Sequence, residues 1–302
     1  MKSGEFDVAV CDFLVSAVNF PQHPAIPVVL FEHNVEWELM RLQSPLAPSL
    51  RERIAVSIES RRLRAFEAGA VARFAHTVAV SEEDAAALRA LAGHSRVTAI
   101  PTGVDLASYR PSVIPASGAP TVTFVGHMGY LPNIDAVTWF CREIWPQILA
   151  AVPSAQFFIV GRSPRPSVLA LASDSVHVTG EVASVAEYLR TASVVVVPLR
   201  AGSGTRLKIY EAMAAGRPVV STSLGAAGLD VHPGQDIVIA DDAAAIASEV
   251  TALLKSPDRA AAIGDRAAKT AAEYGWPAVA ARFESILESV IREHGEGGTA
   301  SL

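Results

Sequence analysis

Short apolar runs alternate with helix-like segments along this sequence, and this alternation restricts the fold more than any other feature. The runs are rich in β-branched residues, and their alternation with helical segments is typical of βαβ units with parallel strands. In the second half the predicted strands cover residues 121–126, 156–161, 176–180, 193–199, 217–222 and 236–240. Six strands complete one doubly wound sheet.

The first half of the chain has fewer strands, and a proline-rich stretch separates it from the second half. Its predicted strands cover residues 6–13, 26–32, 76–81 and 96–103, with a long helical stretch near 49–73. A chain of 302 residues exceeds the usual size of one domain. We therefore predict two α/β domains, residues 1–110 and 121–275, joined by a linker at 111–120. Residues 276–302 are predicted to form a helix that packs back toward the first domain and a tail that frays after Glu293.

Composition and cysteine spacing exclude several classes of protein. The 25 basic and 31 acidic residues give a net charge of −6, which does not suit a general nucleic-acid binder. Cys11 and Cys141 are far apart and have no metal-binding spacing, so we predict neither disulfide nor zinc site, as fits a reducing cytoplasm. No secretory leader and no run of about 18 apolar residues is recognisable. We expect a soluble or peripherally attached protein.

The stretch "VPLRAGSGTRLKIYEAMAAGRPVVSTS", residues 197–223, contains the strongest candidate site. A strand and a Gly/Ser loop lead into a helix that begins near Thr205, and its first turn carries Arg206 and Lys208. Cations are unfavourable at a helix start unless an anion binds there, where backbone N–H groups and the helix dipole converge. The alternative is a tight turn with two solvated cations. Glu211 either pairs with Lys208 on the surface or accepts hydrogen bonds from ribose hydroxyls.

"GTRLKIYEAMAAGRPVVSTSLGAAGL" closely resembles the nucleotide-sugar-binding signature of the retaining family 4 glycosyltransferases. "TVTFVGHMGYLPNIDAVTWFCREIWPQI", "FIVGR", "VTGEV", "VAVSEEDAAAL" and "IPTGVDLASYRP" are similar to other segments of that family, in the same order. The resemblance implies a GT-B fold, in which two Rossmann-like domains each contain a doubly wound parallel sheet. It begins only partway into the usual acceptor domain, so we expect the N-terminal domain to be incomplete. Its sheet would then have an unpaired edge, which leaves self-association open.

The resemblance also assigns roles to residues of the second domain. It places the turn of Gly126, His127 and Gly129 beside the donor diphosphate, and Arg162 and Val182 near the nucleobase. The loop of Ser203, Gly204 and Thr205, followed by Arg206 and Lys208, would hold the diphosphate, and Glu211 would hold the ribose. For His127, packing or helix capping is the alternative.

In the first domain the resemblance makes His33 a contact of the donor sugar. The alternative is a strand-end histidine that binds a neighbouring carboxylate such as Glu32 or Glu36. Many family members also carry two glutamates eight positions apart, but counting back from Glu211 leads to Ser203. We therefore expect backbone groups of Gly204 and Thr205 to contact the sugar instead.

The resemblance implies a metal-independent glycosyltransferase without a cofactor. It would transfer a sugar from a UDP-, GDP- or ADP-linked donor to a saccharide or lipid-linked acceptor, with retention, in surface polysaccharide or glycolipid synthesis. Fixed cations would stabilise the charge that develops on the leaving diphosphate. The alternatives are a non-catalytic nucleotide-binding remnant or partner-dependent subunit, and a nucleotide-sugar 2-epimerase. NAD(P) binding is disfavoured because "FVGHMG" offers GxxG rather than GxGxxG.

A cationic stripe is predicted on the helical stretch of the first half. Arg51, Arg62 and Arg73 recur at a spacing of eleven residues, which keeps them on one helical face. Such a stripe either rests on anionic lipid, at the inner face of a membrane, or is a solvated surface.

Overall fold

The computed structural model describes residues 6–43, 49–93, 96–111, 118–201 and 206–299, without the side chains of 42–43 and 296–299. The chain divides into two compact units. Unit 1 contains the described residues of Met1–Thr102 and Pro277–Leu302, and unit 2 contains those of Gly103–Gly202 and Arg206–Trp276. Each unit is built on one parallel sheet, which confirms the predicted α/β class. The predicted domain boundaries stay predictions, and residues 112–117 of the predicted linker lie outside the described residues.

Unit 1 contains a four-stranded parallel sheet in the order β1-β2-β3-β4. Val10 pairs with Val29 and Leu30 with Thr77, so each strand lies beside its neighbour in sequence. All four strands fall within the predicted runs, and they are β1 (Ala9–Asp12), β2 (Val28–Glu32), β3 (His76–Ala79) and β4 (Val97–Ala99).

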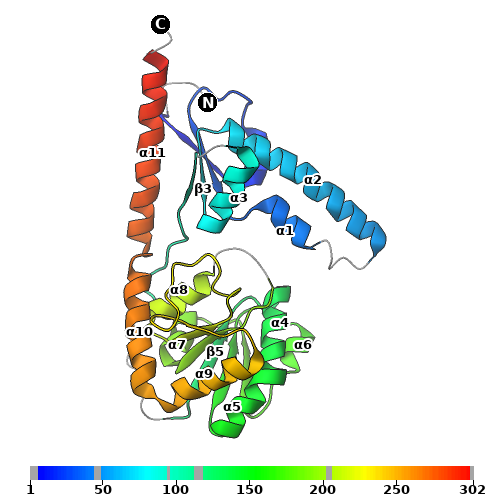
Figure 1. Cartoon of the computed structure of the whole chain (residues 1–302), viewed down its shortest axis with the longest axis vertical. Helices are drawn as coiled ribbons and strands as arrows, with labels where there is room; N and C mark the ends of the chain where they lie inside the picture. The colour runs from blue at the N-terminus through cyan, green and yellow to red at the C-terminus, as the bar shows by residue number, and fades with distance from the viewer. Residues whose placement is uncertain (1–5, 44–48, 94–95, 112–117, 202–205, 300–302) are drawn as a thin grey trace. The chain divides into compact units, whose positions relative to one another are not determined.

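Helices cover the two faces of the unit 1 sheet unequally (Figure 1). On one face Cys11 and Leu30 are buried against a cluster that includes Val71 and Leu88. On the other face Val29 packs in a cluster with Val290 from the C-terminal helix, while Val10 on β1 stays exposed. The helices of this unit are η1 (Leu14–Asn19), α1 (Glu36–Gln43), α2 (Leu50–Arg73), α3 (Glu82–Ala92) and most of α11 (Trp276–Thr299).

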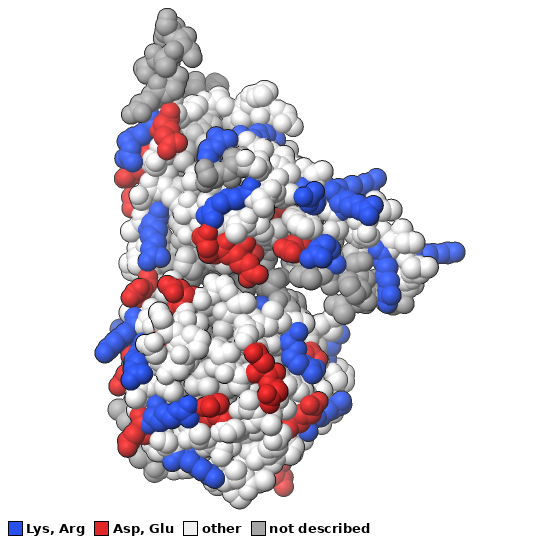
Figure 2. All heavy atoms as spheres, viewed as in Figure 1, with Lys and Arg blue, Asp and Glu red and all other residues white. Residues whose placement is uncertain are grey.

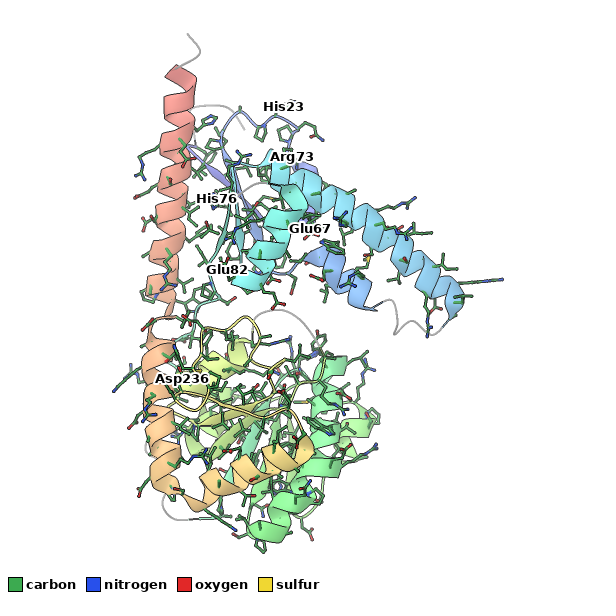
Figure 3. The ribbon with its side chains drawn as sticks, viewed as in Figure 1. His23, Glu67, Arg73, His76, Glu82 and Asp236 are labelled. Atoms are coloured by element: carbon green, nitrogen blue, oxygen red, sulfur yellow. The ribbon has the colours of Figure 1, made fainter. Side chains whose placement is uncertain are left out.

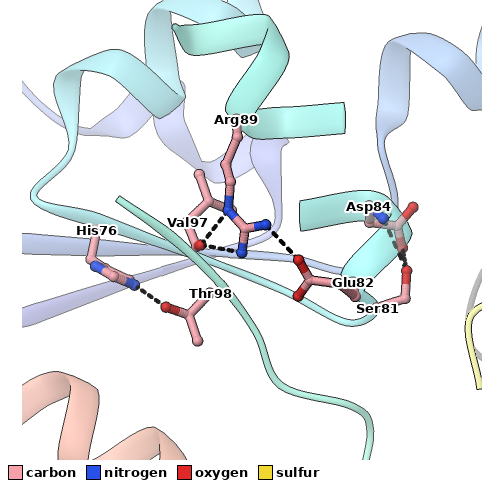
Figure 4. A network of polar contacts seen from close by, with 7 residues as sticks. All are labelled: His76, Ser81, Glu82, Asp84, Arg89, Val97 and Thr98. Carbon is pink, nitrogen blue, oxygen red and sulfur yellow. Dashed lines mark hydrogen bonds and ion pairs between the residues drawn. The ribbon is translucent and has the colours of Figure 1, made fainter. Parts of the chain in front are cut away.

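A side-chain network ties the short edge strand β4 to α3 (Figure 4). The Arg89 guanidinium donates to the Val97 carbonyl at 3.0 and 2.8 Å and also pairs with Glu82. The His76 ring is hydrogen-bonded to the Thr98 hydroxyl at 2.9 Å. These contacts compensate for the small number of ladder hydrogen bonds that a three-residue strand can make.

Unit 2 contains a six-stranded parallel sheet in the order β10-β9-β8-β5-β6-β7. The chain therefore winds outward from β5 in one direction and returns through β8 in the other, so the topology switches between β5 and β8. Ligands of open α/β sheets bind at such a switch point, outside the carboxyl ends of the strands. The six predicted strands are confirmed as β5 (Thr121–Val125), β6 (Gln156–Val160), β7 (Val176–Gly180), β8 (Val194–Val197), β9 (Val219–Ser221) and β10 (Val238–Ile239).

The unit 2 sheet is buried by helices and by aromatic packing. All four valines of β8 are buried, as expected for a strand covered on both faces, and Phe140 and Phe157 lie 4.5 Å apart in the core. The covering elements are α4 (Leu131–Trp139), the π-helical η3 (Phe140–Ile144), α5 (Trp145–Ala151), α6 (Pro166–Leu169), α7 (Val185–Thr191), α8 (Leu207–Ala214), α9 (Ala243–Lys255) and α10 (Pro257–Ala272).

The end of the chain differs from the prediction. The helix α11 continues to Thr299, so the tail predicted to fray after Glu293 is helical for six more residues. Each residue added to an existing helix gains a backbone hydrogen bond, so extension is easier than a new start. None of the helices in the described ranges is both long enough and apolar enough to span a bilayer.

Candidate functional site

Three elements of unit 2 meet where β5 ends, and Lys208 from α8 lies at their junction. Its ammonium donates to Asn133 Oδ1 on α4 at 2.8 Å, and Asn133 Nδ2 donates to the His127 carbonyl at 3.0 Å. A Cβ atom on Gly126 would lie 3.0 Å from Lys208 Nζ and 2.8 Å from Asn133 Nδ2. The Lys208 ammonium is therefore held against the bare backbone of the turn that follows β5.

The surroundings of Lys208 favour an anion. The ammonium lies 4.6 Å from the centroid of the Phe124 ring. Burial, helped by the Arg206 charge and opposed by Glu211, lowers the pKa of Lys208 from 10.5 to about 7. A negative ligand next to Lys208 would stabilise the charged ammonium that burial disfavours.

Arg206 precedes α8 and adds a second positive charge to the same end of the helix. Only 7% of its surface is exposed, and Nη2 donates to the Leu224 carbonyl at 3.4 Å. The first turn of α8 contains no acidic residue, and no side chain caps the helix at Arg206. Helix N–H groups, the helix dipole and two cations thus converge on one point. The alternative of two solvated cations is wrong, because neither side chain extends into bulk solvent.

Glu211 lies one turn after Lys208, but its hydrogen-bonding partner is Tyr109 rather than Lys208. The Tyr109 hydroxyl donates to Glu211 Oε1 at 3.1 Å. Burial raises the pKa of Glu211, while the Tyr109 hydrogen bond and the Lys208 charge oppose that shift. A carboxylate oriented by a tyrosine beside a cationic helix start can accept hydrogen bonds from a polar ligand.

Close backbone contacts hold the glycine turn after β5 in place. Gly126 N donates to the Val160 carbonyl at 3.0 Å, and Met128 N donates to the Arg162 carbonyl at 2.9 Å. Gly161 has a φ of 149°, and a Cβ atom there would lie only 1.8 Å from the Gly126 carbonyl oxygen. Only glycine allows the ends of β5 and β6 to approach this closely.

The structure therefore groups some of the predicted donor-site residues and separates others. The Lys208 ammonium lies against the backbone of Gly126. The charges of Arg206 and Glu211 shift the pKa of Lys208 in opposite directions. The side chain of His127 is exposed, while its backbone carbonyl accepts the hydrogen bond from Asn133. The Gly129 carbonyl accepts a hydrogen bond from the Arg165 guanidinium at 3.3 Å. Arg162 follows β6 and Val182 follows β7, one and two strands from β5. Their roles stay predictions, and Ser203, Gly204 and Thr205 lie outside the described residues.

His33 belongs to unit 1, where it follows β2. Its Nε2 atom lies 2.8 Å from Asp12 Oδ1, and its ring stacks on Phe13 with centroids 4.0 Å apart. The alternative considered from the sequence named Glu32 or Glu36 as a carboxylate partner, and the partner in the structure is Asp12 instead. Asp12 replaces them because β1 and β2 are parallel neighbours whose carboxyl ends meet at one edge, where Asp12 is in register with Phe31.

Two buried carboxyl groups flank His33, and one of them supports the segment that follows it. Glu67 on α2 accepts hydrogen bonds from the backbone N–H groups of Glu36 and Trp37, both at 2.9 Å, and so caps α1 (Figure 3). Burial raises the pKa of Glu67 to about 7, and burial together with the Glu67 charge raises the pKa of Glu32 to about 9. Within the described ranges, no three His, Cys, Asp or Glu side chains are grouped to hold a metal ion.

Two family profiles match the sequence, one on each side of residue 110. The profile described as "Glycosyltransferase Family 4" matches residues 1–108, and the profile described as "Glycosyl transferases group 1" matches residues 119–256. The chain belongs to the family 4-like glycosyltransferases. The profile boundaries resemble those of the two sheets, because each profile contains all the strands of one unit.

Known proteins similar to this chain agree with that family assignment. A phosphatidyl-myo-inositol mannosyltransferase from Mycolicibacterium smegmatis is 29% identical over 202 residues, which cover 63% of this chain and 51% of that protein. The chain spans between 51% and 58% of the first three curated relatives that it matches.

Solved structures of similar fold show that this chain has the GT-B fold. A sucrose-phosphate synthase from Thermosynechococcus elongatus superposes with a TM-score of 0.75 at 20% identity, covering 96% of this chain and 75% of its own. Anabaena HepE in complex with UDP and glucose superposes with a TM-score of 0.67 at 17% identity. The match covers 94% of this chain and 78% of HepE. The structural match covers more of the chain than the sequence match, so the fold persists where sequence similarity is lost.

Tyr109 and Asn133 were not predicted from the sequence. Tyr109 is 102 residues from Glu211, and Asn133 is 75 residues from Lys208. The sequence indicated only that both residues lie in segments that resemble the family, not which atoms they contact. Their roles as hydrogen-bonding partners depend on the strand order, which places the end of β5 next to β8.

Proposed function

We propose that this glycosyltransferase transfers a sugar from a nucleoside diphosphate sugar to a saccharide or lipid-linked acceptor, with retention of the anomeric configuration. The observation that carries the proposal is the pair Arg206 and Lys208 at the start of α8, with the Lys208 ammonium held beside Gly126. Two cations at the N-terminus of a helix match the charge of a diphosphate.

The proposed site stabilises the charge that develops during transfer. When the bond between the sugar and the diphosphate breaks, negative charge increases on the leaving group. Arg206, Lys208 and the N–H groups of α8 are fixed before the reaction, so they stabilise this charge without reorganising. The loop of Ser203, Gly204 and Thr205 is proposed to add backbone donors. Glu211, oriented by the Tyr109 hydroxyl, would bind the ribose.

Other assignments complete the proposal. HepE, which shares the fold, was crystallised with UDP and glucose, and this supports a nucleotide donor whose base we leave open among uracil, guanine and adenine. The name of the relative from Mycolicibacterium smegmatis, a phosphatidyl-myo-inositol mannosyltransferase, supports a lipid-linked acceptor and a place in glycolipid synthesis. His33, paired with Asp12, would contact the donor sugar.

A non-catalytic or partner-dependent nucleotide-binding protein is the second candidate. The cations at the start of α8 would bind a diphosphate whether or not sugar transfer follows. The second candidate predicts nucleotide binding without turnover, whereas the first candidate predicts both.

The two candidates are distinguished by incubating the purified full chain with UDP-, GDP- and ADP-linked sugars and a bacterial lipid extract. Product formation, followed by mass spectrometry, is expected for the wild-type chain and should be lost in Lys208→Ala. A matched control is Lys255→Ala at the exposed end of α9, which should keep the activity. Nucleotide binding without any product would contradict the enzymatic proposal and leave the second candidate.

A further inference from the structure

The helix α4 is bound by two cationic side chains that lie on either side of residues 202–205 in the sequence. Lys208, which follows that segment, donates to Asn133 Oδ1 at 2.8 Å. Arg200, which precedes it, donates to both carboxylate oxygens of Asp135, from Nε at 3.0 Å and from Nη2 at 2.7 Å. One helix therefore holds both the segment that leaves β8 and the start of α8.

The contact of Arg200 is more rigid than an ordinary surface ion pair. Its guanidinium also lies 4.7 Å from the centroid of the Trp139 ring, and only 6% of Trp139 is exposed. Asp135 and Trp139 are four residues apart, so they lie on one face of α4. Two parallel hydrogen bonds and an aromatic ring beneath the guanidinium together fix its plane. This geometry is the exception to the rule that half-exposed ion pairs contribute little.

The two contacts hold different faces of α4. Asn133 is 6% exposed and lies on the core side with Ala136 and Val137, while Asp135 is half-exposed. Residues two apart are separated by about 200° around a helix. A helix that is held on two faces cannot rotate or slide without breaking one of the contacts. Any such movement would displace Asn133 and with it the ammonium that it holds beside the turn after β5.

The position of the pair distinguishes it from other ion pairs of unit 2. Figure 2 shows acidic and basic side chains interspersed on the visible face of this unit, so a charged pair is not unusual there. Arg259 and Glu249 are 2.7 Å apart and 42% and 37% exposed, close to the 45% and 42% of Arg200 and Asp135. They join α10 to α9, which carry none of the predicted site residues. The Arg200 pair instead follows β8 at the carboxyl end of the sheet, where ligands of open α/β sheets bind.

Arg73 in unit 1 shows a similar arrangement of an arginine over an aromatic ring. Its guanidinium donates to the Ala17 carbonyl at 2.9 Å and lies 4.5 Å from the centroid of the Phe74 ring. These contacts anchor the end of α2 to η1. Arg73 therefore does not share the exposed surface of Arg51 and Arg62, which corrects the predicted stripe of three arginines.

We propose that Arg200 is a positioning residue for the diphosphate site. By pairing with Asp135 it fixes α4, and α4 carries the Asn133 amide that holds the Lys208 ammonium. Arg200 is not assigned to the ligand itself, because Nε and Nη2 are both engaged by Asp135. The proposal rests on the proposed function, since it concerns the same site. A cation that is fixed before the ligand arrives binds it without reorganisation.

Isothermal titration of the full chain tests the proposal, with the best-binding nucleoside diphosphate and with its nucleoside. Arg200→Ala should weaken diphosphate binding about fivefold and leave nucleoside binding nearly unchanged. Asp135→Ala should have the same effect, and the double variant should bind no more weakly than either single variant, because the two residues act as one unit. Arg200→Lys should recover only part of the affinity, since an ammonium lacks the planar fork. Arg259→Ala, the matched control, should bind like the wild type.

The sign of the Asp135→Ala effect separates positioning from a direct charge effect. If Arg200 acted on the ligand through its charge, removal of the Asp135 carboxylate would strengthen diphosphate binding, and this result would overturn the proposal. Additive losses in the double variant, or equal affinities of Arg200→Ala and Arg259→Ala, would overturn it as well.

Failure of the proposed function has a different signature. In that case Lys208→Ala binds the diphosphate like the wild type, or the wild type binds none, and both proposals fall. If only the Arg200 inference fails, Lys208→Ala still weakens binding while Arg200→Ala does not. Urea unfolding checks that each variant is folded. A loss of stability with an unchanged ratio of diphosphate to nucleoside affinity would show a purely structural pair and would contradict the positioning role.

Discussion

Nucleoside diphosphate binding by this chain should weaken as pH rises above about 7. The reason is Lys208, whose burial beside Arg206 lowers its pKa to about 7 in the free protein. A diphosphate next to the ammonium favours the protonated form and raises that pKa in the complex. Binding is therefore coupled to proton uptake, and affinity falls with pH until the pKa of the complex is reached.

The magnitude follows from the fraction of Lys208 that is protonated before the ligand binds. With a pKa of about 7, half of the ammonium groups are charged at pH 7 and about 3% at pH 8.5. The dissociation constant should then rise about 16-fold between these values, which corresponds to about 1.6 kcal/mol. The terminal phosphate, with a second pKa near 6, keeps its charge across this range.

Isothermal titration of the full chain with UDP, GDP and ADP at both pH values measures this change. Repeating it in two buffers of different ionisation enthalpy gives the proton uptake, expected to rise from about 0.5 to nearly 1 per nucleotide. Lys208→Arg is the matched control, because its guanidinium stays charged throughout and should flatten the dependence. Equal affinities at pH 7 and 8.5 with no proton uptake would refute a diphosphate contact of Lys208.

Three further variants test the surroundings of the site and the core. Asn133→Ala removes the acceptor that holds the Lys208 ammonium and should weaken nucleotide binding roughly tenfold; unchanged affinity in titration would show that the contact does not position Lys208. Gly161→Ala should destabilise the chain by about 3 kcal/mol or more in urea unfolding, whereas Gly180→Ala, with a φ of 69° and open space around its Cβ position, should cost about 1 kcal/mol. Similar losses at both glycines would argue against the close approach of β5 and β6. Glu32, whose pKa is raised from 4.5 to about 9, binds its proton more tightly in the folded chain, so stability should fall as pH rises from about 5 to 8. Glu32→Gln should remove on the order of 3 kcal/mol of that fall, and parallel pH profiles for the two proteins would contradict its burial as a neutral acid.

Local patterns were sufficient to predict the strands and the start of α8. A run such as "SVVVVPL" is apolar on both faces, and only a strand inside a covered parallel sheet accommodates it. The cations at Arg206 and Lys208 were informative because helix electrostatics alone disfavours them. Both features depend on residues that are close in sequence, so they could be interpreted without the fold.

Contacts between distant segments could not be predicted in the same way. Asp12 approaches His33 only because β1 and β2 are parallel neighbours, and Asn133 approaches Lys208 only because the sheet places β5 beside β8. Sheet order is decided by packing of whole units, which no local pattern records.

The most direct test of the central claim is a comparison of nucleoside diphosphate and nucleoside binding. Whichever of UDP, GDP and ADP binds best is titrated alongside its nucleoside, with the wild-type chain and with Lys208→Ala. If the start of α8 binds the diphosphate, the substitution should weaken diphosphate binding at least tenfold and leave nucleoside binding nearly unchanged. Equal weakening of both ligands, or no binding of any nucleoside diphosphate by the wild type, would contradict the account.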